Sequence, residues 1–142
     1  MTNKLAQFFM LLLATTTLAA CQADSRQQIL SMDKSQVALR TAQSRAFDTS
    51  DTTLTVRTVI ATLQDLSFTI DKVDNTLGLV SATKAGNSLL RMTVTVRPRG
   101  SHQIIVRASA QERLNAISDA VPYQQFFDNL AQALFLEAHE II

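Results

Sequence analysis

The sequence predicts an α+β fold of two layers, in which an antiparallel sheet of four to five strands carries two helices on one face, in the order β-α-β-β-β-β-α. Large apolar and polar residues alternate in "LLRMTVTVRPR" and "HQIIVRASAQ", as in strands with one buried face. Apolar residues at helical spacing flank these strands on both sides. A length of 142 residues with three Gly and two Pro suits one domain with one core.

The first predicted elements are a strand and a helix. "RTAQSRAF" (40–47) is the expected first strand, and Asp48, Ser50 and Asp51 then offer caps for a helix. Within "TTLTVRTVIATLQDLSF" the large apolar residues follow helical spacing, but many residues are β-branched and lower helix propensity. A strand is therefore the alternative, and the spacing together with the cap favours the helix.

Four strands and a helix complete the pattern. The expected strands are "SFTIDKV", "LGLVSAT", "LLRMTVTVRPR" and "HQIIVRASAQ", with turns at "DNTLG" and at "PRGS" (98–101). Ser118 or Asp119 is expected to cap the last helix, with Pro122 near its first turn. Its aromatic residues Phe126, Phe127 and Phe135 lie on one apolar stripe, and we expect them to pack in the core instead of lining a ligand pocket.

The N-terminus carries the marks of a lipoprotein signal. Lys4 precedes an uncharged, mostly apolar run (5–20) that is too short to span a bilayer, as a spanning helix needs about 20 residues. The run ends in "LAAC" (18–21), which resembles the bacterial lipobox. The resemblance implies cleavage between Ala20 and Cys21, and acylation at Cys21, the only cysteine. The alternative is a plain signal peptide, or a hydrophobic helix with a chance Cys.

The lipobox divides the chain into three parts. Residues 1–20 are the removed signal peptide, 21–39 are the lipidated Cys21 with a polar tether, and 40–142 form a single α+β domain. A short amphipathic helix over 27–39 is an alternative for part of the tether. Position two of the mature chain is Gln22, whereas Asp there resembles an inner-membrane retention signal. We therefore expect a lipid anchor in the outer membrane, on its periplasmic face.

Two further segments carry a family resemblance. "LQDLSFTIDKVDNTLGLVSATK" (63–84) and "YQQFFDNLAQALFLEAHE" (123–140) resemble small bacterial envelope lipoproteins of uncharacterised function. The first segment is also similar, more distantly, to the helix-grip domains of the BamC-type lipoprotein of the outer-membrane assembly machine. Ser67 stands where such sequences often have Gly after the helix, so we expect this helix end to close differently. The resemblance implies an accessory subunit of an envelope complex.

Composition and motifs argue against several other functions. Cleavage would remove Lys4 from the 13 basic residues and leave 12 against 12 acidic ones, so general nucleic-acid binding is not expected. His102 and His139 stand alone, without the ligand spacing of a metal site. Asp71 and Asp74 are explained by a solvated turn, and no nucleophile elbow or phosphate loop occurs. We expect no enzyme activity, no metal and no cofactor.

Basic residues concentrate in the central strands. Residues 84–113 contain six Lys and Arg against Glu112 alone. The alternation puts Arg91, Arg97 and Arg107 opposite the apolar residues, on a face that could bind anionic groups such as lipopolysaccharide phosphates or peptidoglycan carboxylates. An ordinary solvated face whose arginines discourage aggregation is the alternative. The sequence thus predicts a membrane-anchored interaction module with an envelope protein partner, or a binding module for an anionic glycan or lipid.

Overall fold

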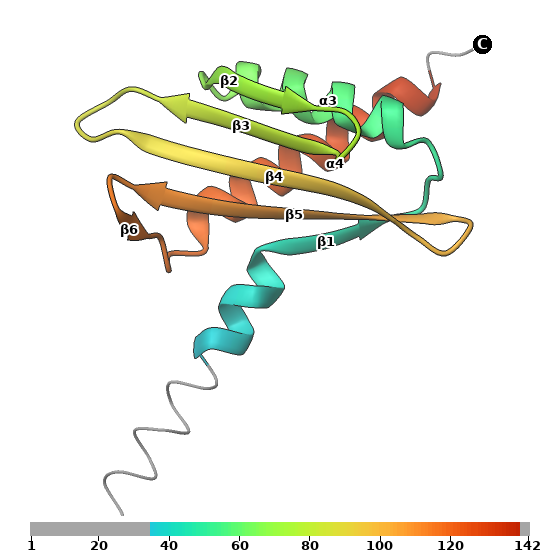
Figure 1. Cartoon of the computed structure of the whole chain (residues 1–142). Helices are drawn as coiled ribbons and strands as arrows, with labels where there is room; N and C mark the ends of the chain where they lie inside the picture. Colours follow the sequence, from blue (N-terminus) through green and yellow to red (C-terminus); the bar gives the residue numbers. More distant parts are fainter. Residues whose placement is uncertain (1–34, 140–142) are drawn as a thin grey trace, which may run out of the picture. The chain divides into compact units, whose positions relative to one another are not determined.

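The computed structural model describes residues 35–139 and the side chains of residues 35–135 (Figure 1). The predicted signal peptide, the predicted lipobox and the first part of the predicted tether therefore lie outside the described residues. Leu39–Ile142 forms one compact unit, separate from Met1–Ala38. After a helix over residues 35–42, the elements are β1 (Ser44–Phe47), α3 (Thr52–Asp65), β2 (Thr69–Asp74), β3 (Leu79–Lys84), β4 (Leu90–Arg99), β5 (Gln103–Glu112), β6 (Asn115–Ala116) and α4 (Val121–His139).

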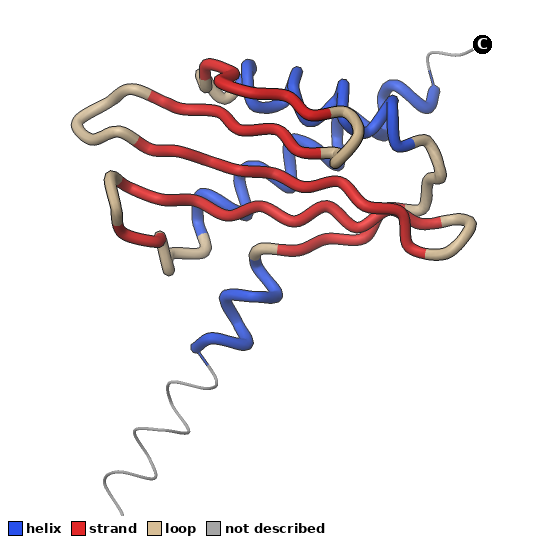
Figure 2. The backbone as a smooth tube through the Cα atoms, viewed as in Figure 1, coloured by secondary structure: helices blue, strands red, loops and turns tan. Residues whose placement is uncertain are grey.

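The strands form one antiparallel sheet in the order β1-β5-β4-β3-β2, and the two-residue β6 adds to β5 beyond the end of β1. Helix α3 packs on β2, β3 and β4, whereas α4 packs on β5 and on α3. Both helices lie on one side of the sheet (Figures 1 and 2). The predicted α+β class and its two-layer arrangement are confirmed, with β6 as a strand that the sequence did not indicate.

The core lies between the sheet and the two helices. Every second residue of β3, β4 and β5 is buried there, and the intervening residues face away from the helices. This alternation follows from the pleat, which points successive side chains to opposite faces. The buried hydrophobic residues are Val56, Val59, Leu63, Phe68, Val80, Ala82, Met92, Val94, Val96, Ile104, Val106, Ala108, Ala110, Tyr123, Phe126, Phe127 and Leu130.

The segment 52–65 is a helix, as its apolar spacing predicted. Asp51 is the N-cap, and its Oδ1 accepts a hydrogen bond of 2.8 Å from the backbone N of Leu54. Two of the buried threonines donate their hydroxyls to carbonyls one turn back, Thr55 to Asp51 and Thr58 to Leu54. Thr55 and Thr58 thus satisfy their buried hydroxyls inside the helix, so burying these β-branched residues does not prevent the helix from forming.

Helix α3 ends on Ser67, which adopts the left-handed conformation with φ of 66°. The backbone N of Phe68 donates to the carbonyl of Leu63 and that of Ser67 to Gln64, both at 2.9 Å. This is the hydrogen-bond pattern of a Schellman motif, which usually has Gly at the left-handed position. The expectation that Ser67 closes the helix differently is wrong, because the serine adopts the backbone conformation of the glycine that it replaces.

The first predicted strand, 40–47, is too long. Residues 35–42 are helical, and β1 begins only at Ser44. The backbone N of Gln43 donates to the carbonyl of Leu39 and closes that helix, while the Gln43 carbonyl accepts from Ala108 on β5. Gln43 is thus the point at which the chain passes from helix to sheet. The poor apolar alternation in this segment reflects the change of structure inside it.

The predicted turn at 98–101 is also displaced. Pro98 and Arg99 remain in β4, where Pro98 pairs with Ile104 on β5, and the turn covers residues 100–102. A proline cannot donate a ladder hydrogen bond, and a sheet tolerates it only where no partner strand needs that donor. Strand β3 pairs with β4 only up to Thr95, so Pro98 lies beyond the end of that neighbour.

The β2–β3 turn contains a glycine that the fold requires. Gly78 has φ of 59°, and a Cβ atom built on it would overlap the carbonyl oxygen of Val96. The Gly78 carbonyl in turn accepts a 2.7 Å hydrogen bond from the backbone N of Val96. Asp74 holds the same turn by accepting from the backbone N of Leu77 at 3.0 Å. The turn is therefore joined directly to the central strand β4.

At the start of α4, Asp119 Oδ1 accepts a 3.0 Å hydrogen bond from the backbone N of Val121. Pro122 follows in the first turn, where its missing N–H has no partner to lose. Of the two expected caps, Ser118 and Asp119, the aspartate makes this contact.

Candidate functional site

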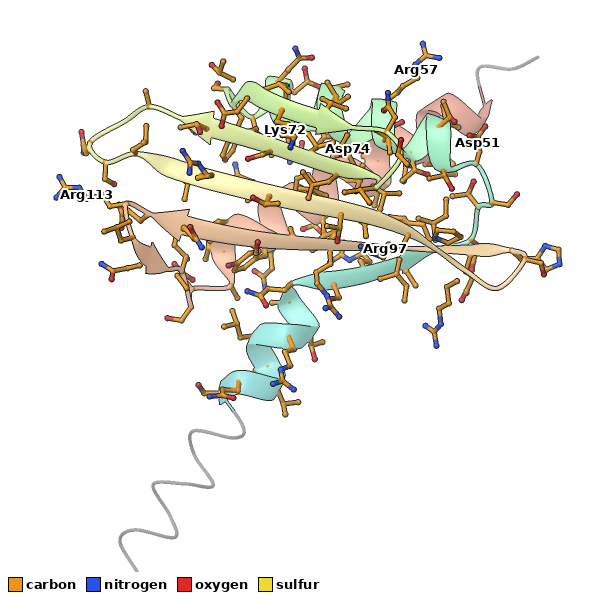
Figure 3. The ribbon with its side chains drawn as sticks, in the orientation of Figure 1. Asp51, Arg57, Lys72, Asp74, Arg97 and Arg113 are labelled. Carbon is orange, nitrogen blue, oxygen red and sulfur yellow. The ribbon has the colours of Figure 1, made fainter. Side chains whose placement is uncertain are left out.

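The helix-free face of the sheet is a polar surface that carries the predicted arginines. On β4 the exposed Arg91 and Arg97 alternate with buried Met92, Val94 and Val96, and Arg107 is exposed on β5. All three predicted arginines therefore lie on the face opposite the helices. Figure 3 shows Arg97 over β4 and β5, on the side of the sheet away from α3 and α4.

The register of β4 and β5 brings Arg97 close to Arg107 and leaves Arg91 apart from both. Arg97 lies opposite Ile105, and Thr95 lies opposite Arg107, so Arg97 and Arg107 are diagonal neighbours on adjacent strands. Diagonal pairs of this kind are within reach of long side chains. Arg91 lies six residues from Arg97 along β4, about 20 Å away. One small anion could thus contact Arg97 and Arg107, whereas Arg91 would need an extended ligand.

Hydroxyl-bearing residues occupy much of the surface between the arginines. Ser81 on β3, Thr93 on β4 and Ser109 on β5 form one row across the sheet, and Lys72 on β2 continues it. Thr83 donates its hydroxyl to Asp71, so that carboxylate is already engaged on this face. The surface therefore combines hydrogen-bonding groups with exposed positive charge.

Arg40 joins this surface, although it was not among the arginines predicted to lie there. Arg40, Gln43, Ser44 and Arg107 line a hollow of about 400 Å³ beside β1. Arg40 and Arg107 are far apart along the chain, and only the pairing of β1 with β5 brings them together. No periodicity within one segment could reveal a contact that depends on the tertiary fold.

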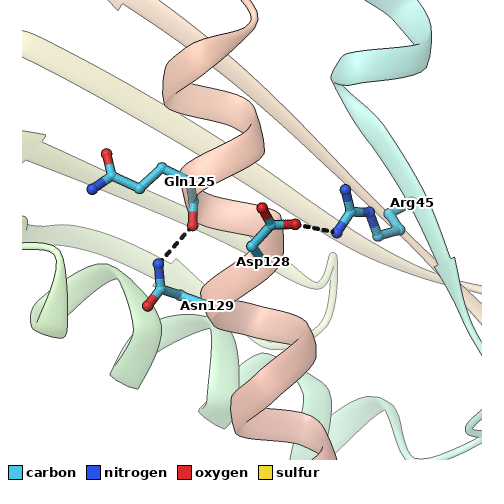
Figure 4. A network of polar contacts seen from close by, with 4 residues as sticks. All are labelled: Arg45, Gln125, Asp128 and Asn129. Carbon is cyan, nitrogen blue, oxygen red and sulfur yellow. Dashed lines mark hydrogen bonds and ion pairs between the residues drawn. The ribbon is translucent and has the colours of Figure 1, made fainter.

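Arg45, the next arginine along β1, has a different role. Its Nη1 lies 3.0 Å from Oδ1 of Asp128 on α4, and its guanidinium lies 5.2 Å from the centre of the Phe127 ring. Figure 4 shows this pair beside Asn129, whose Nδ2 donates to the Gln125 carbonyl at 2.7 Å. Arg45 thus connects β1 to the helix layer, on the side of the sheet opposite Arg107.

The stripe of phenylalanines on α4 is only partly in the core. Phe126 and Phe127 are buried and meet edge to face, with ring centres 5.1 Å apart, as expected. Phe135 is 63% exposed, so the expectation of core packing is wrong for this residue. Phe135 instead forms part of the wall of a shallow hollow of about 250 Å³ that Phe47 and Leu54 also line.

The two histidines belong to different parts of the fold, His102 to the β4–β5 turn and His139 to the end of α4. His102 is in the β4–β5 turn, in an open hollow with Arg99 and Asp48, where Gln103 Nε2 donates to Asp48 Oδ1 at 2.6 Å. The side chain of His139 lies outside the described part of α4. Across the residues that the structure describes, no three His, Cys, Asp or Glu side chains are grouped so that they could hold a metal ion.

No protein-family model and no curated protein matches this sequence. None of the described helices is both long and apolar enough to cross a membrane.

Proposed function

We propose that the protein is a non-catalytic interaction module, held by acyl chains on Cys21 at the periplasmic face of the outer membrane, and that it is an accessory subunit of an envelope complex. The anchor is inferred from the lipobox "LAAC" at residues 18–21. The complex is inferred from the resemblance to envelope lipoproteins and from the helix-free face of the sheet.

One observation carries the proposal. The helix-free face carries arginines that form no ion pair with a carboxylate among residues 35–135. The ion pair in this part of the chain joins Arg45 to Asp128, on the other side of the sheet. Arginine is enriched at protein interfaces, since its planar group forms several hydrogen bonds and stacks on flat groups. A polar sheet face can also be simply solvated, so the face must be tested for a partner.

Site-specific crosslinking in intact cells tests the proposal. A photoreactive amino acid at Thr93 or Thr95 samples the helix-free face, and the same amino acid at the exposed Gln124 or Gln132 of α4 is the matched control. We expect a discrete crosslinked product from the sheet positions that the α4 positions do not give. Monomer alone at every sheet position, or equal capture from α4, would argue against a partner on this face.

A second candidate function is favoured by the arginines themselves. The face carrying Arg91, Arg97 and Arg107 could bind an anionic glycan or lipid, such as peptidoglycan or lipopolysaccharide. Replacing all three by Ser should abolish retention on these polymers without lowering stability, because the three side chains are exposed. Unchanged retention of the triple variant would exclude this function for the face.

A further inference from the structure

A polar hollow lies where residues 39–43 lead into the sheet. Its walls are Arg40, Gln43, Ser44 and Arg107, and its volume is about 400 Å³. Two of the four lining residues are cationic and none is acidic. Two guanidinium groups around one hollow repel each other unless an anion lies between them. The hollow therefore has the charge of an anion site.

Three of the four lining residues, Gln43, Ser44 and Arg107, are held by hydrogen bonds. Arg107 Nε donates to Ser44 Oγ at 3.2 Å, which orients the guanidinium and leaves its two Nη groups for a ligand. Gln43 makes three hydrogen bonds. Its backbone N donates to the Leu39 carbonyl, and its carbonyl accepts from the backbone N of Ala108. Its side-chain Nε2 donates to the hydroxyl of Tyr123 at 3.2 Å. Groups that are ordered before binding lose little conformational entropy when the ligand arrives.

We propose that this hollow binds a phosphate group, with Arg107 as the oriented donor and Arg40 as the second cation. Arginine binds phosphate through two parallel N–H···O bonds, and a phosphate monoester carries enough charge for two guanidinium groups. The volume is larger than a phosphate ion needs and falls within the range of small-molecule sites. The hollow therefore has room for a phosphate ester as well as for free phosphate.

The source that the chain favours is a phospholipid headgroup. This step rests on the proposed anchor at Cys21, which precedes Arg40 by 19 residues. A chain of that length spans at most about 65 Å, so a lipidated Cys21 would confine Arg40 to that distance from the membrane and allow it to reach the surface. Basic residues within a Debye length of an anionic membrane surface are attracted to its headgroups. A soluble phosphate ester offers the same chemistry, and the experiment separates the two sources.

The first arm of the test uses the full protein in a non-ionic, phosphate-free detergent and titrates inorganic phosphate. Saturable binding that weakens about tenfold in each of Arg40→Gln and Arg107→Gln is expected, since each loses charge-assisted hydrogen bonds. Arg57→Gln is the matched control, because Arg57 is also exposed but lies on α3. Equal phosphate binding in the wild type and in both hollow variants would overturn the proposal.

The second arm repeats the titration with the protein in phosphatidylglycerol vesicles. If a headgroup fills the hollow, inorganic phosphate binds more weakly in vesicles than in detergent, and Arg40→Gln abolishes that difference. Equal affinity in both media would overturn the headgroup as the source. Ser44→Ala removes the hydrogen bond to Arg107 but keeps both positive charges. This variant should weaken phosphate binding less than either arginine variant. A loss of affinity as large as that in Arg107→Gln would show that charge is not the determinant.

The two proposals fail in different ways. Crosslinking from Thr93 and Thr95 reports a protein partner whether or not Arg40 and Arg107 bind phosphate. If Arg40→Gln and Arg107→Gln lose phosphate binding but the crosslinks from Thr93 and Thr95 remain, the phosphate site and the protein partner are each supported by their own measurement. A urea unfolding curve for Arg107→Gln that matches the wild type shows that the loss does not come from unfolding.

Discussion

The hydroxyl of Tyr123 on α4 accepts a hydrogen bond of 3.1 Å from the backbone N of Ala110 on β5. Ala110 lies between the stretch of β5 that pairs with β1 and the stretch that pairs with β6, so no strand provides an acceptor there. The same hydroxyl donates to the Ile117 carbonyl at 2.9 Å and accepts from Gln43 at 3.2 Å. A helix side chain thus completes the sheet edge.

Tyr123→Phe should therefore destabilise the domain. The tyrosine is fully buried, and removing its hydroxyl leaves the Ala110 N–H without an acceptor. We expect the free energy of unfolding to fall by about 2 kcal/mol. Urea unfolding measures the change. Gln124→Ala, at the neighbouring exposed position, is the control and should stay within about 0.5 kcal/mol of the wild type. Equal stability of the two variants would contradict the role of the hydroxyl.

Gly78→Ala should be the more damaging of two glycine substitutions. Gly78 and Gly100 both have positive φ, at 59° and 65°, so alanine is strained by about 1 kcal/mol at either position. Only at Gly78 would the new methyl group also collide with the Val96 carbonyl, whereas the space around Gly100 is open. Thermal unfolding of both variants compares them, and a larger loss at Gly100 would refute the assigned contact.

Ser67→Gly should stabilise the protein. The serine holds a left-handed conformation at the end of α3, which glycine adopts without strain, so a gain of about 1 kcal/mol is expected. Ser67→Ala keeps the Cβ atom and serves as the control, with little change. The gain is read from the midpoint of urea unfolding, and a destabilised glycine variant would disprove the interpretation.

Thr62→Val should also raise stability. Among the described residues, Thr62 Oγ1 is the buried side-chain polar atom without a hydrogen-bond partner. Valine has nearly the same shape, and removing an unsatisfied hydroxyl should gain about 1 kcal/mol. Thr58→Val is the matched control on the same helix, because Thr58 donates to the Leu54 carbonyl at 2.9 Å and should lose stability. The difference between the two free energies of unfolding is the decisive quantity.

Cys21→Ser should release the protein from the membrane. Each buried methylene of an acyl chain contributes about 0.8 kcal/mol to membrane binding, and serine offers no thiol for the lipid. Mass spectrometry of the wild-type product should show acyl chains on Cys21 as its first residue. A mature product with a free thiol at this position would remove the basis for the proposed location.

Local pattern was sufficient for α3, α4 and the inner strands, but not for the helix over residues 35–42. Met92, Val94 and Val96 alternate with polar residues, and β4 buries those three side chains as this period requires. Asp51 precedes the apolar spacing of α3 and caps that helix. These features depend on neighbours within a few residues, so a single segment contains all the information needed to predict them.

The sequence by itself determined the fold class, the two layers and the face that carries Arg91, Arg97 and Arg107, because strand and helix periods are local properties. Only the tertiary structure decided where β1 begins, that Tyr123 completes the edge of β5, and that Arg40 lies beside Arg107. These three features depend on contacts between residues distant in the chain. Such contacts form only when the hydrophobic faces of sheet and helices are buried together, and no local period encodes them.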